Sequence, residues 1–335
     1  MFGKKTVFVV GAGAGVEYHM PMGKELKSSI ESKLTANEDP LWHSLAAPLA
    51  LANQNEAMKY HELKKFIASN MGRAESIDNF LHTHSENHNL VTIGKTAIAL
   101  CILEAERGSS FMPYDKRNND PFSYLRTVSD SWLTRFCTMA LTGILRSEAR
   151  HAFDNVTIVT FNYDRCIEMY LVDHIKDYLG MRVEEAREIV DAINIIHVYG
   201  KVGKLPWQKG PAPEVAYGMR LANEQLLTVS QQIRTFTERL DQDDTQQRIE
   251  TELADAELVV FSGFSYGSSN WEFLQNATPG PRKNVIAGVY GISEPNQANI
   301  ANRLRNELHP GAEVVVHTCQ KGFLDLLYDY STFFE

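Results

Sequence analysis

Basic residues, cysteines and long apolar runs are all scarce in this sequence of 335 residues. With 33 lysines and arginines against 42 aspartates and glutamates, the net charge is −9, which argues against a protein whose main task is to bind phosphate backbones. No apolar run approaches the roughly 20 residues that span a bilayer, and the run before the first glycines is too short for the core of a signal peptide. We therefore expect a cytoplasmic protein that binds neither membrane nor nucleic acid.

The scarcity of cysteine excludes two further classes of protein. The 4 cysteines lie far apart in the sequence, so there is no Cys-x-x-Cys pair to hold zinc and no dense disulfide framework. They are Cys101, Cys137, Cys166 and Cys319. We expect reduced thiols and no metal site.

What the chain does contain is ample apolar material, at 44% of its residues. This excludes a disordered chain, and the length predicts about two domains. Short, continuous apolar runs alternate with helical sequence, which is typical of a parallel sheet covered on both faces. We predict a Rossmann-like α/β fold of about six strands. The runs cover residues 6–10, 156–161, 193–199, 258–264, 284–290 and 313–318.

Between residues 36 and 150 the strand signal disappears and apolar residues recur at helical spacing, with a polar, proline-bearing interruption at 112–121. We interpret residues 36–150 as an inserted helical domain, and residues 1–35 and 151–335 as the Rossmann-like domain. The segment 204–218 is rich in proline and glycine, which favours a functional loop.

The first predicted strand ends in the sequence GAGAG, and a helix should begin near Gly23. Glycines at this point let backbone amides approach a pyrophosphate, and a helix N-terminus adds positive potential. The alternative is a plain tight turn. The spacing of a dehydrogenase fingerprint is missing, because the third glycine is displaced. The candidate nucleotide-binding residues are Gly11, Ala12, Gly13, Ala14 and Gly15.

Two more predicted strands end in polar residues at the same edge of the sheet, where α/β proteins bind their ligands. TFNYD places Asn162 and Asp164 there, and HVYG places His197 there. An asparagine amide can hold a ribose hydroxyl or a water, and a histidine can act as a base near neutral pH. The alternative for Asn162 or Asp164 is a cap for the next helix.

A fourth strand end, GFSYG, contains Gly263 and Ser265 and matches the pattern of a serine hydrolase elbow. A hydrolase would also need an acid and a histidine, for which Glu294 and His309 are the candidates. No oxyanion segment of the HGGG type precedes the elbow. The alternative is a glycine-serine turn packed under a nucleotide.

GAGAG, TFNYD and HVYG, in this order, resemble the Sir2 family, and more closely its bacterial SIR2-like branch of NAD-cleaving antiphage effectors. The resemblance covers roughly residues 4–30 and 155–330, and SIDNFL at residues 76–81 looks like a recurring element of the helical insertion in that branch. It implies that the glycine turn and Glu17 lie along the dinucleotide. It also implies that Asn162 and Asp164 match the family's asparagine motif, and that Ser265 matches a later nucleotide contact.

The sequence departs from sirtuin deacylases at two points. No cysteine lies between Cys166 and Cys319, so the zinc module of deacylases is missing, which argues against protein deacylation. The family's histidine directly precedes a glycine, whereas Tyr199 takes that place here and His197 lies two residues earlier. Positions two apart in a strand face the same side, so we expect His197 to reach the site. Tyr199 stays the alternative for this role.

The resemblance implies a NAD+ hydrolase that releases nicotinamide and ADP-ribose, with NAD+ as substrate and no further cofactor. Asn162 would orient the ribose or the water, His197 would act as base, and Asp164 would position these groups or stabilise positive charge. We expect a gated antiphage effector that depletes cellular NAD+, working as a homo-oligomer or with a separate sensor subunit. The alternatives are a serine hydrolase using Ser265 and a non-catalytic module that binds NAD or ADP-ribose.

Overall fold

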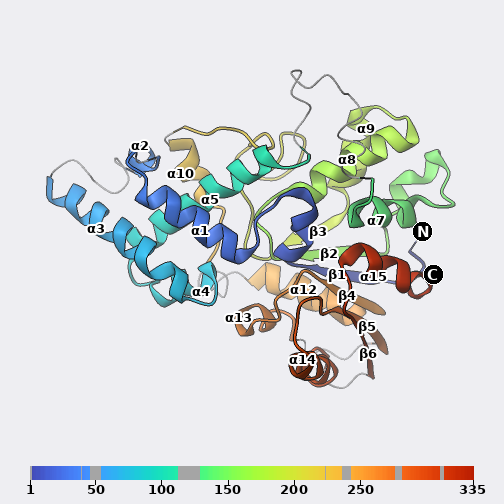
Figure 1. The fold of residues 1–335 in the computed structure, drawn as a ribbon. Coiled ribbons are helices and arrows are strands. Elements are labelled where there is room, and N and C mark those ends of the chain that lie inside the picture. Colours follow the sequence, from blue (N-terminus) through green and yellow to red (C-terminus); the bar gives the residue numbers. More distant parts are fainter. Residues whose placement is uncertain are drawn as a thin grey trace.

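The computed structural model describes residues 2–38, 40–45, 54–111, 129–222, 224–235, 243–275, 281–309 and 313–335. At its centre lies a parallel sheet of six strands in the order β3-β2-β1-β4-β5-β6 (Figure 1). The strands are β1 (Thr6–Val10), β2 (Val156–Thr160), β3 (Asn194–His197), β4 (Leu258–Ser262), β5 (Lys283–Gly288) and β6 (Val314–Cys319). This strand order is that of dinucleotide-binding folds, and it confirms the predicted Rossmann-like architecture.

Alternation along the strands divides the core between the two faces of the sheet. Val7 and Val9 of β1 belong to one hydrophobic cluster, and Phe8 and Val10 belong to the other. The first face packs against α12 (Asp243–Asp255), which precedes β4, and α14 (Glu294–Glu307), which connects β5 to β6. The second face packs against α7 (Trp132–Leu141), α8 (Cys166–Leu179), α9 (Val183–Asp191) and α15 (Phe323–Asp329).

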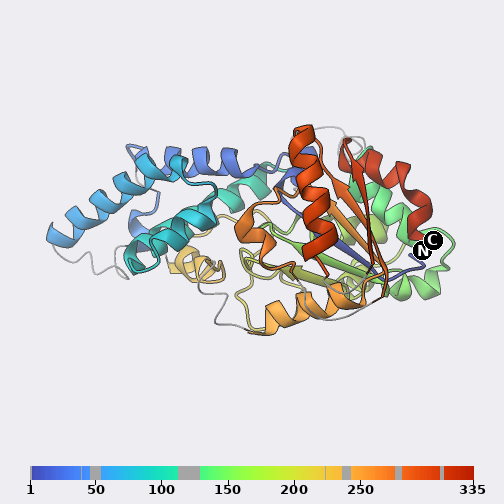
Figure 2. The same cartoon turned by 90° about the horizontal axis from the view of Figure 1, so that it is seen from below.

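Most of the predicted helical insertion extends to one side of the sheet (Figure 2). Its elements are α2 (Trp42–Leu45), α3 (Gln54–Asn70), η2 (Met71–Arg73), α4 (Ile77–Thr83) and α5 (His88–Gly108), and they pack with α1 (Gly23–Thr35) and α10 (Glu224–Ser230). Buried residues of this group belong to the same hydrophobic cluster as Val7 and Val9 of the sheet. By contrast, α7 and η3 (Arg146–His151), which the sequence also placed in the insertion, contribute to the core of the second face. The domain boundaries at residues 35 and 150 stay a prediction.

The strands β2 to β5 end one or two residues earlier than the apolar runs predict, whereas β1 ends as predicted and β6 ends one residue later. β3 ends at His197 because residues 198–199 form a turn that the amide of Gly200 closes on the carbonyl of His197. Gly200 has φ +71, in the left-handed region that favours glycine. After β1 the chain forms the 3-10 helix η1 (Ala12–Tyr18) before α1 begins at Gly23. The predicted interruption at 112–121 falls outside the described residues.

The remaining elements are short, namely α13 (Ser268–Trp271) after β4 and η4 (Ser331–Phe334) at the C-terminal end. All four cysteines are buried and carry free thiols. Within the described ranges, no helix combines the length and the apolar character needed to cross a bilayer.

Candidate functional site

The turns after β1 and β4 touch each other at the carboxyl edge of the sheet. The amide of Gly11 donates to the carbonyl of Ser262 at 2.9 Å, and the amide of Gly13 donates to the carbonyl of Gly263 at 3.0 Å. A Cβ atom on Gly11 would lie 2.4 Å from the carbonyl oxygen of Gly263. These glycines are therefore required first for the close approach of two backbones, as in the tight-turn alternative. The edge where they meet is the point at which the strand order reverses, the usual ligand position in such folds.

The glycine turn differs from the expected phosphate loop in its hydrogen bonds, and the 3-10 helix η1 separates it from the next α-helix. The amide of Ala14 also has a protein partner, the carbonyl of Gly11 at 3.1 Å. The helix α1 begins at Gly23, as predicted, which is twelve residues downstream of Gly11 and beyond η1. Gly13 is exposed and Ala12 is half-buried, whereas Gly15 is buried against Met20. Nucleotide binding by this turn stays a prediction.

Asn162 lies in the turn after β2, and its polar groups form hydrogen bonds with residues at the ends of β1 and β2. Its amide donates to the hydroxyl of Thr160 at 3.1 Å, and its side-chain Nδ2 donates to the carbonyl of Gly11 at 3.4 Å. The side-chain Oδ1 is buried and accepts no hydrogen bond from any residue that the structure describes. A buried acceptor without a partner costs about 1–3 kcal/mol, and in native proteins it calls for an explanation such as a ligand.

Asp164 lies two residues before α8, the helix that follows the Asn162 turn. Its Oδ1 accepts the amide of Cys166, the first residue of α8, at 3.0 Å. Burial raises the pKa of Asp164, although this hydrogen bond acts in the opposite direction. Asp164 therefore holds the first amide of α8 from one position before the N-cap residue, Arg165, and its catalytic role stays a prediction.

Glu17 lies on η1, near the second face of the sheet. Its carboxylate accepts the amide of Trp132, the first residue of α7, at 3.0 Å. Desolvation raises the pKa of this carboxyl, with the Trp132 amide acting against it. Glu17 therefore binds the start of a helix, and its expected place along a dinucleotide stays a prediction.

His197 points toward α8 and is enclosed by protein. Its Nδ1 lies 3.0 Å from the carbonyl oxygen of Asn162, and its Nε2 lies 3.1 Å from Oε1 of Glu168. Lys201 donates to the same Glu168 oxygen at 2.8 Å. Burial disfavours the charged carboxylate, yet Lys201 and His197 hold the pKa of Glu168 well below its usual range.

Tyr199 leaves the sheet edge in a different direction from His197. Because β3 ends at His197, the strand alternation that would place both side chains on one side does not continue to residue 199. The Tyr199 hydroxyl donates to Oδ1 of Asn270 at 2.6 Å, on α13. The argument from strand alternation, by which His197 would face the same side as Tyr199, is therefore wrong, although His197 does contact the carbonyl of Asn162.

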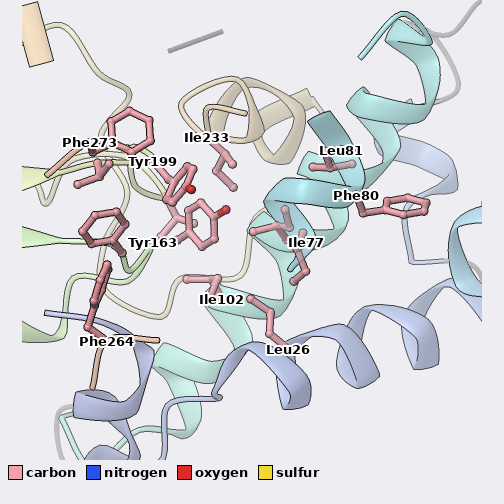
Figure 3. Close-up of a cluster of buried hydrophobic side chains, with 14 of the residues drawn as sticks. Leu26, Ile77, Phe80, Leu81, Ile102, Tyr163, Tyr199, Ile233, Phe264 and Phe273 are labelled. Carbon is pink, nitrogen blue, oxygen red and sulfur yellow. The ribbon is translucent and has the colours of Figure 1, made fainter. Parts of the chain in front are cut away.

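Tyr163, the neighbour of Asn162, reaches the helical insertion. Figure 3 shows Tyr163 beside Tyr199, with Ile77 and Ile102 of the insertion across from them. The Tyr163 hydroxyl donates to Oδ1 of Asp78 on α4, within the SIDNFL sequence. The structure thus brings two of the singled-out sequences, TFNYD and SIDNFL, into direct contact.

A buried ion pair fixes the chain immediately after Asp164. The guanidinium of Arg165 binds the carboxylate of Glu106, near the end of α5, and both side chains are 0% exposed. The same carboxylate accepts the amides of Arg165 at 3.0 Å and Gly218 at 2.9 Å. One side chain of the insertion therefore ties the site turn to the 204–218 loop.

The geometry around Ser265 does not form the catalytic triad of a serine hydrolase. Its Oγ accepts the amide of Gly267 at 3.5 Å, and no histidine in the described part of the chain is hydrogen-bonded to it. Glu294 begins α14 and His309 lies just beyond that helix, so about 20 Å of helix separates them at 1.5 Å per residue. The left-handed residues of the turn are Gly263 and Tyr266, whereas an elbow strains its serine.

Sequence reasoning missed Glu168, Lys201, Asp78 and Glu106, because their contacts join segments that are far apart in the chain. One signal was present: Glu168 lies among apolar residues on the buried side of α8, where an acidic residue needs a partner. In the ranges that the structure describes, no three His, Cys, Asp or Glu side chains are grouped so that they could hold a metal ion. Neither the comparison with protein-family models nor the comparison with curated proteins found a match to this chain.

Proposed function

We propose that the protein is a NAD+ hydrolase that binds the dinucleotide where the turns after β1, β2 and β4 meet. The observation that carries the proposal is the side-chain Oδ1 of Asn162, which is buried at this edge and has no partner among the described residues. An amide oxygen can accept a hydrogen bond from a ribose hydroxyl or from a water molecule. The resemblance to SIR2-like enzymes supports NAD+ as the nucleotide.

The reaction breaks the bond between C1′ of the ribose and the nicotinamide nitrogen, and the electron pair leaves with nicotinamide. Water then bonds to C1′ and loses a proton, which gives ADP-ribose. The transition state resembles an oxocarbenium ion, as in glycoside hydrolysis. Asn162 orients the ribose or the water, the exposed Gly13 side of the glycine turn lies along the dinucleotide, and Ser265 contacts it from the β4 turn. The raised pKa of Asp164 fits a positioning role more closely than charge stabilisation.

The proposal includes control of the activity, because an ungated enzyme of this kind would deplete NAD+ in its own cell. The contact between Tyr163 and Asp78 supports this part, since it links the turn that carries Asn162 to the helical insertion. We propose that the insertion transmits a signal from a second copy of the chain or from a separate sensor subunit. In this view the protein is an antiphage effector.

The test measures nicotinamide release from NAD+ by the full chain and by Asn162→Ala. Loss of one preorganised polar contact to the reacting group lowers such rates about 100-fold. The matched control is Asn302→Ala, because Asn302 is exposed on α14, outside the site, and its side chain accepts from Arg305 of the same helix. Release that is equal in wild type and in Asn162→Ala would contradict the proposal.

Calorimetric titration of the same proteins with NAD+ measures binding. It therefore also tests a chain that does not cleave NAD+ without its activator. We expect wild type and Asn302→Ala to bind NAD+, and Asn162→Ala to bind it more weakly. Binding without cleavage under every activating condition would favour the non-catalytic module. Ester turnover that is lost in Ser265→Ala would favour the serine hydrolase instead.

A further inference from the structure

The histidine at the end of β3 has surroundings that are unusual for a general base. The side chain of His197 is 7% exposed, and each ring nitrogen faces an oxygen of the protein. One nitrogen faces the Asn162 carbonyl and the other faces the Glu168 carboxylate. A base must direct a lone pair at the proton it removes, within hydrogen-bond distance. Neither nitrogen of His197 is directed at the space beside Oδ1 of Asn162.

The Glu168 carboxylate is held through one of its two oxygens, whereas its Oε2 is buried and has no partner among the described residues. It is 1% exposed, and its Oε1 accepts both Nε2 of His197 and Nζ of Lys201. Lys201 in turn donates to Oε1 of Gln208 at 3.0 Å, and that oxygen also accepts the amide of Leu205. The charged groups around the ring are thus Glu168, Lys201 and Asp164, and they come from α8, from the loop after β3 and from the turn before α8.

The contact with Asn162 completes the set of bonds that holds this residue. The amide of Asn162 donates to Thr160, its Nδ2 donates to Gly11 and its carbonyl oxygen accepts from His197. Among the polar atoms of Asn162, only Oδ1 then has no partner in the described residues. Side chains that are locked by neighbouring hydrogen bonds hold a site within the narrow geometry that its chemistry needs.

We propose that His197 is a positioning residue, which with Glu168 and Lys201 fixes the Asn162 peptide so that Oδ1 faces the bound ribose. The effect on nicotinamide release rests on the proposed function. The effect on the position of the Asn162 side chain does not. This positioning role differs from the role of base that the resemblance implies for His197, and the proton released by water then passes to solvent.

The first experiment compares His197→Gln with His197→Phe in the nicotinamide assay. Glutamine keeps an N–H donor for the Asn162 carbonyl and has no basic nitrogen, whereas phenylalanine keeps a ring of similar size and has no donor. We expect His197→Gln to stay within about 10-fold of wild type and His197→Phe to fall by about 100-fold or more. A base contributes 10²–10⁴-fold, so equal losses of that size in both variants would overturn the proposal.

The second experiment needs no substrate. In ligand-free protein labelled with ¹⁵N-asparagine, we expect the side-chain amide signal of Asn162 to stay in place in His197→Gln and to move in His197→Phe. It should also move in Glu168→Gln, which preserves shape and serves if the phenylalanine variant does not fold. An Asn162 signal that is unchanged in His197→Phe and Glu168→Gln contradicts the inference. Wild type that neither binds nor cleaves NAD+ contradicts the proposed function instead.

Discussion

At the scale of single residues, Asn162 and Asp164 lie two positions apart in one turn but differ in how their side-chain oxygens are bonded. Asp164 is satisfied by the structure, because it accepts the first amide of α8. Asn162 is held at three of its polar groups, while its Oδ1 is buried without a partner in the described chain. The first pattern is typical of a local bond between a side chain and the backbone two residues on, and the second is typical of a ligand contact. The sequence alone left both residues open to both interpretations.

The ion pair between Arg165 and Glu106 gives a prediction about stability. Removing one partner of a fully buried pair leaves an uncompensated charge, so we expect Glu106→Ala to lower the free energy of unfolding by about 3–5 kcal/mol. The control is Glu104→Ala on the same helix. Glu104 pairs with Lys33 at 37% side-chain exposure, and its loss should matter by less than about 1 kcal/mol. Urea denaturation measures the free energy of unfolding of both variants. Equal losses in Glu106→Ala and Glu104→Ala would contradict this prediction.

Glu168 gives a prediction about pH. Its pKa is well below the ordinary value of 4.5, so the unfolded chain takes up a proton at this residue more readily than the folded protein. The resulting stability is present above about pH 4.5 and is lost as the pH falls through the folded pKa. We expect Glu168→Gln to make unfolding less sensitive to acid. Urea denaturation of wild type and Glu168→Gln at about pH 7 and about pH 3.5 measures this difference. If both proteins lose the same free energy of unfolding between the two pH values, the pKa of Glu168 is not lowered in the folded protein.

At the scale of elements, apolar runs were sufficient to predict all six strands, and β1 was predicted with its observed bounds. Apolar runs do not predict where the other strands end, because hydrogen bonds to other parts of the chain determine the ends. The run through HVYG continues past His197, but the turn closed by Gly200 ends β3 there and turns Tyr199 toward α13. The glycine turn shows the same limit: its sequence resembles a phosphate loop, but two of its amides, those of Gly11 and Gly13, donate to carbonyls at the end of β4.

The contact between these two turns predicts an asymmetry between two glycines of the same loop. A Cβ on Gly263 would lie 2.0 Å from the amide nitrogen of Ala14, and φ there is +59. We expect Gly263→Ala to lower the free energy of unfolding by about 2–6 kcal/mol, from left-handed strain plus the clash.

Gly267→Ala is the matched control for this prediction. The nearest atom to its added Cβ would be Oε1 of Glu75 at 3.0 Å, the end of a flexible side chain that can move aside. Urea denaturation of both variants is the measurement. A Gly263→Ala protein as stable as Gly267→Ala would refute the close packing of the two turns.

At the scale of the whole molecule, the helical insertion and one face of the sheet share a single hydrophobic cluster. Residues such as Ile102 of α5 and Tyr199 beyond β3 lie together in Figure 3, although the sequence separates them widely. The sequence predicted the insertion from helical spacing, but spacing carries no information about which faces meet. Contacts such as Tyr163 with Asp78 follow from that packing and could not be predicted locally.

A shared core predicts that the insertion and the sheet unfold together. We expect amide exchange in α5 and in β4 to report the same opening free energy within about 1 kcal/mol, because cooperative units follow buried contacts. Hydrogen exchange read by mass spectrometry at increasing urea measures both. The N-terminal end of the exposed helix α3 provides a fast-exchanging reference. Exchange through α5 at much lower urea than through β4 would show that the insertion is an independent domain.

The most direct measurement of the central claim is a crystal structure of the protein with ADP-ribose, the proposed product. The account predicts the nucleotide at the carboxyl edge between β1, β2 and β4, with Oδ1 of Asn162 about 2.7–3.2 Å from a ribose hydroxyl or a water bound to it. It also predicts that the bonds from Asn162 to Gly11 and His197 are kept. A nucleotide bound elsewhere, or Oδ1 of Asn162 turned away from a ribose at this edge, would contradict it.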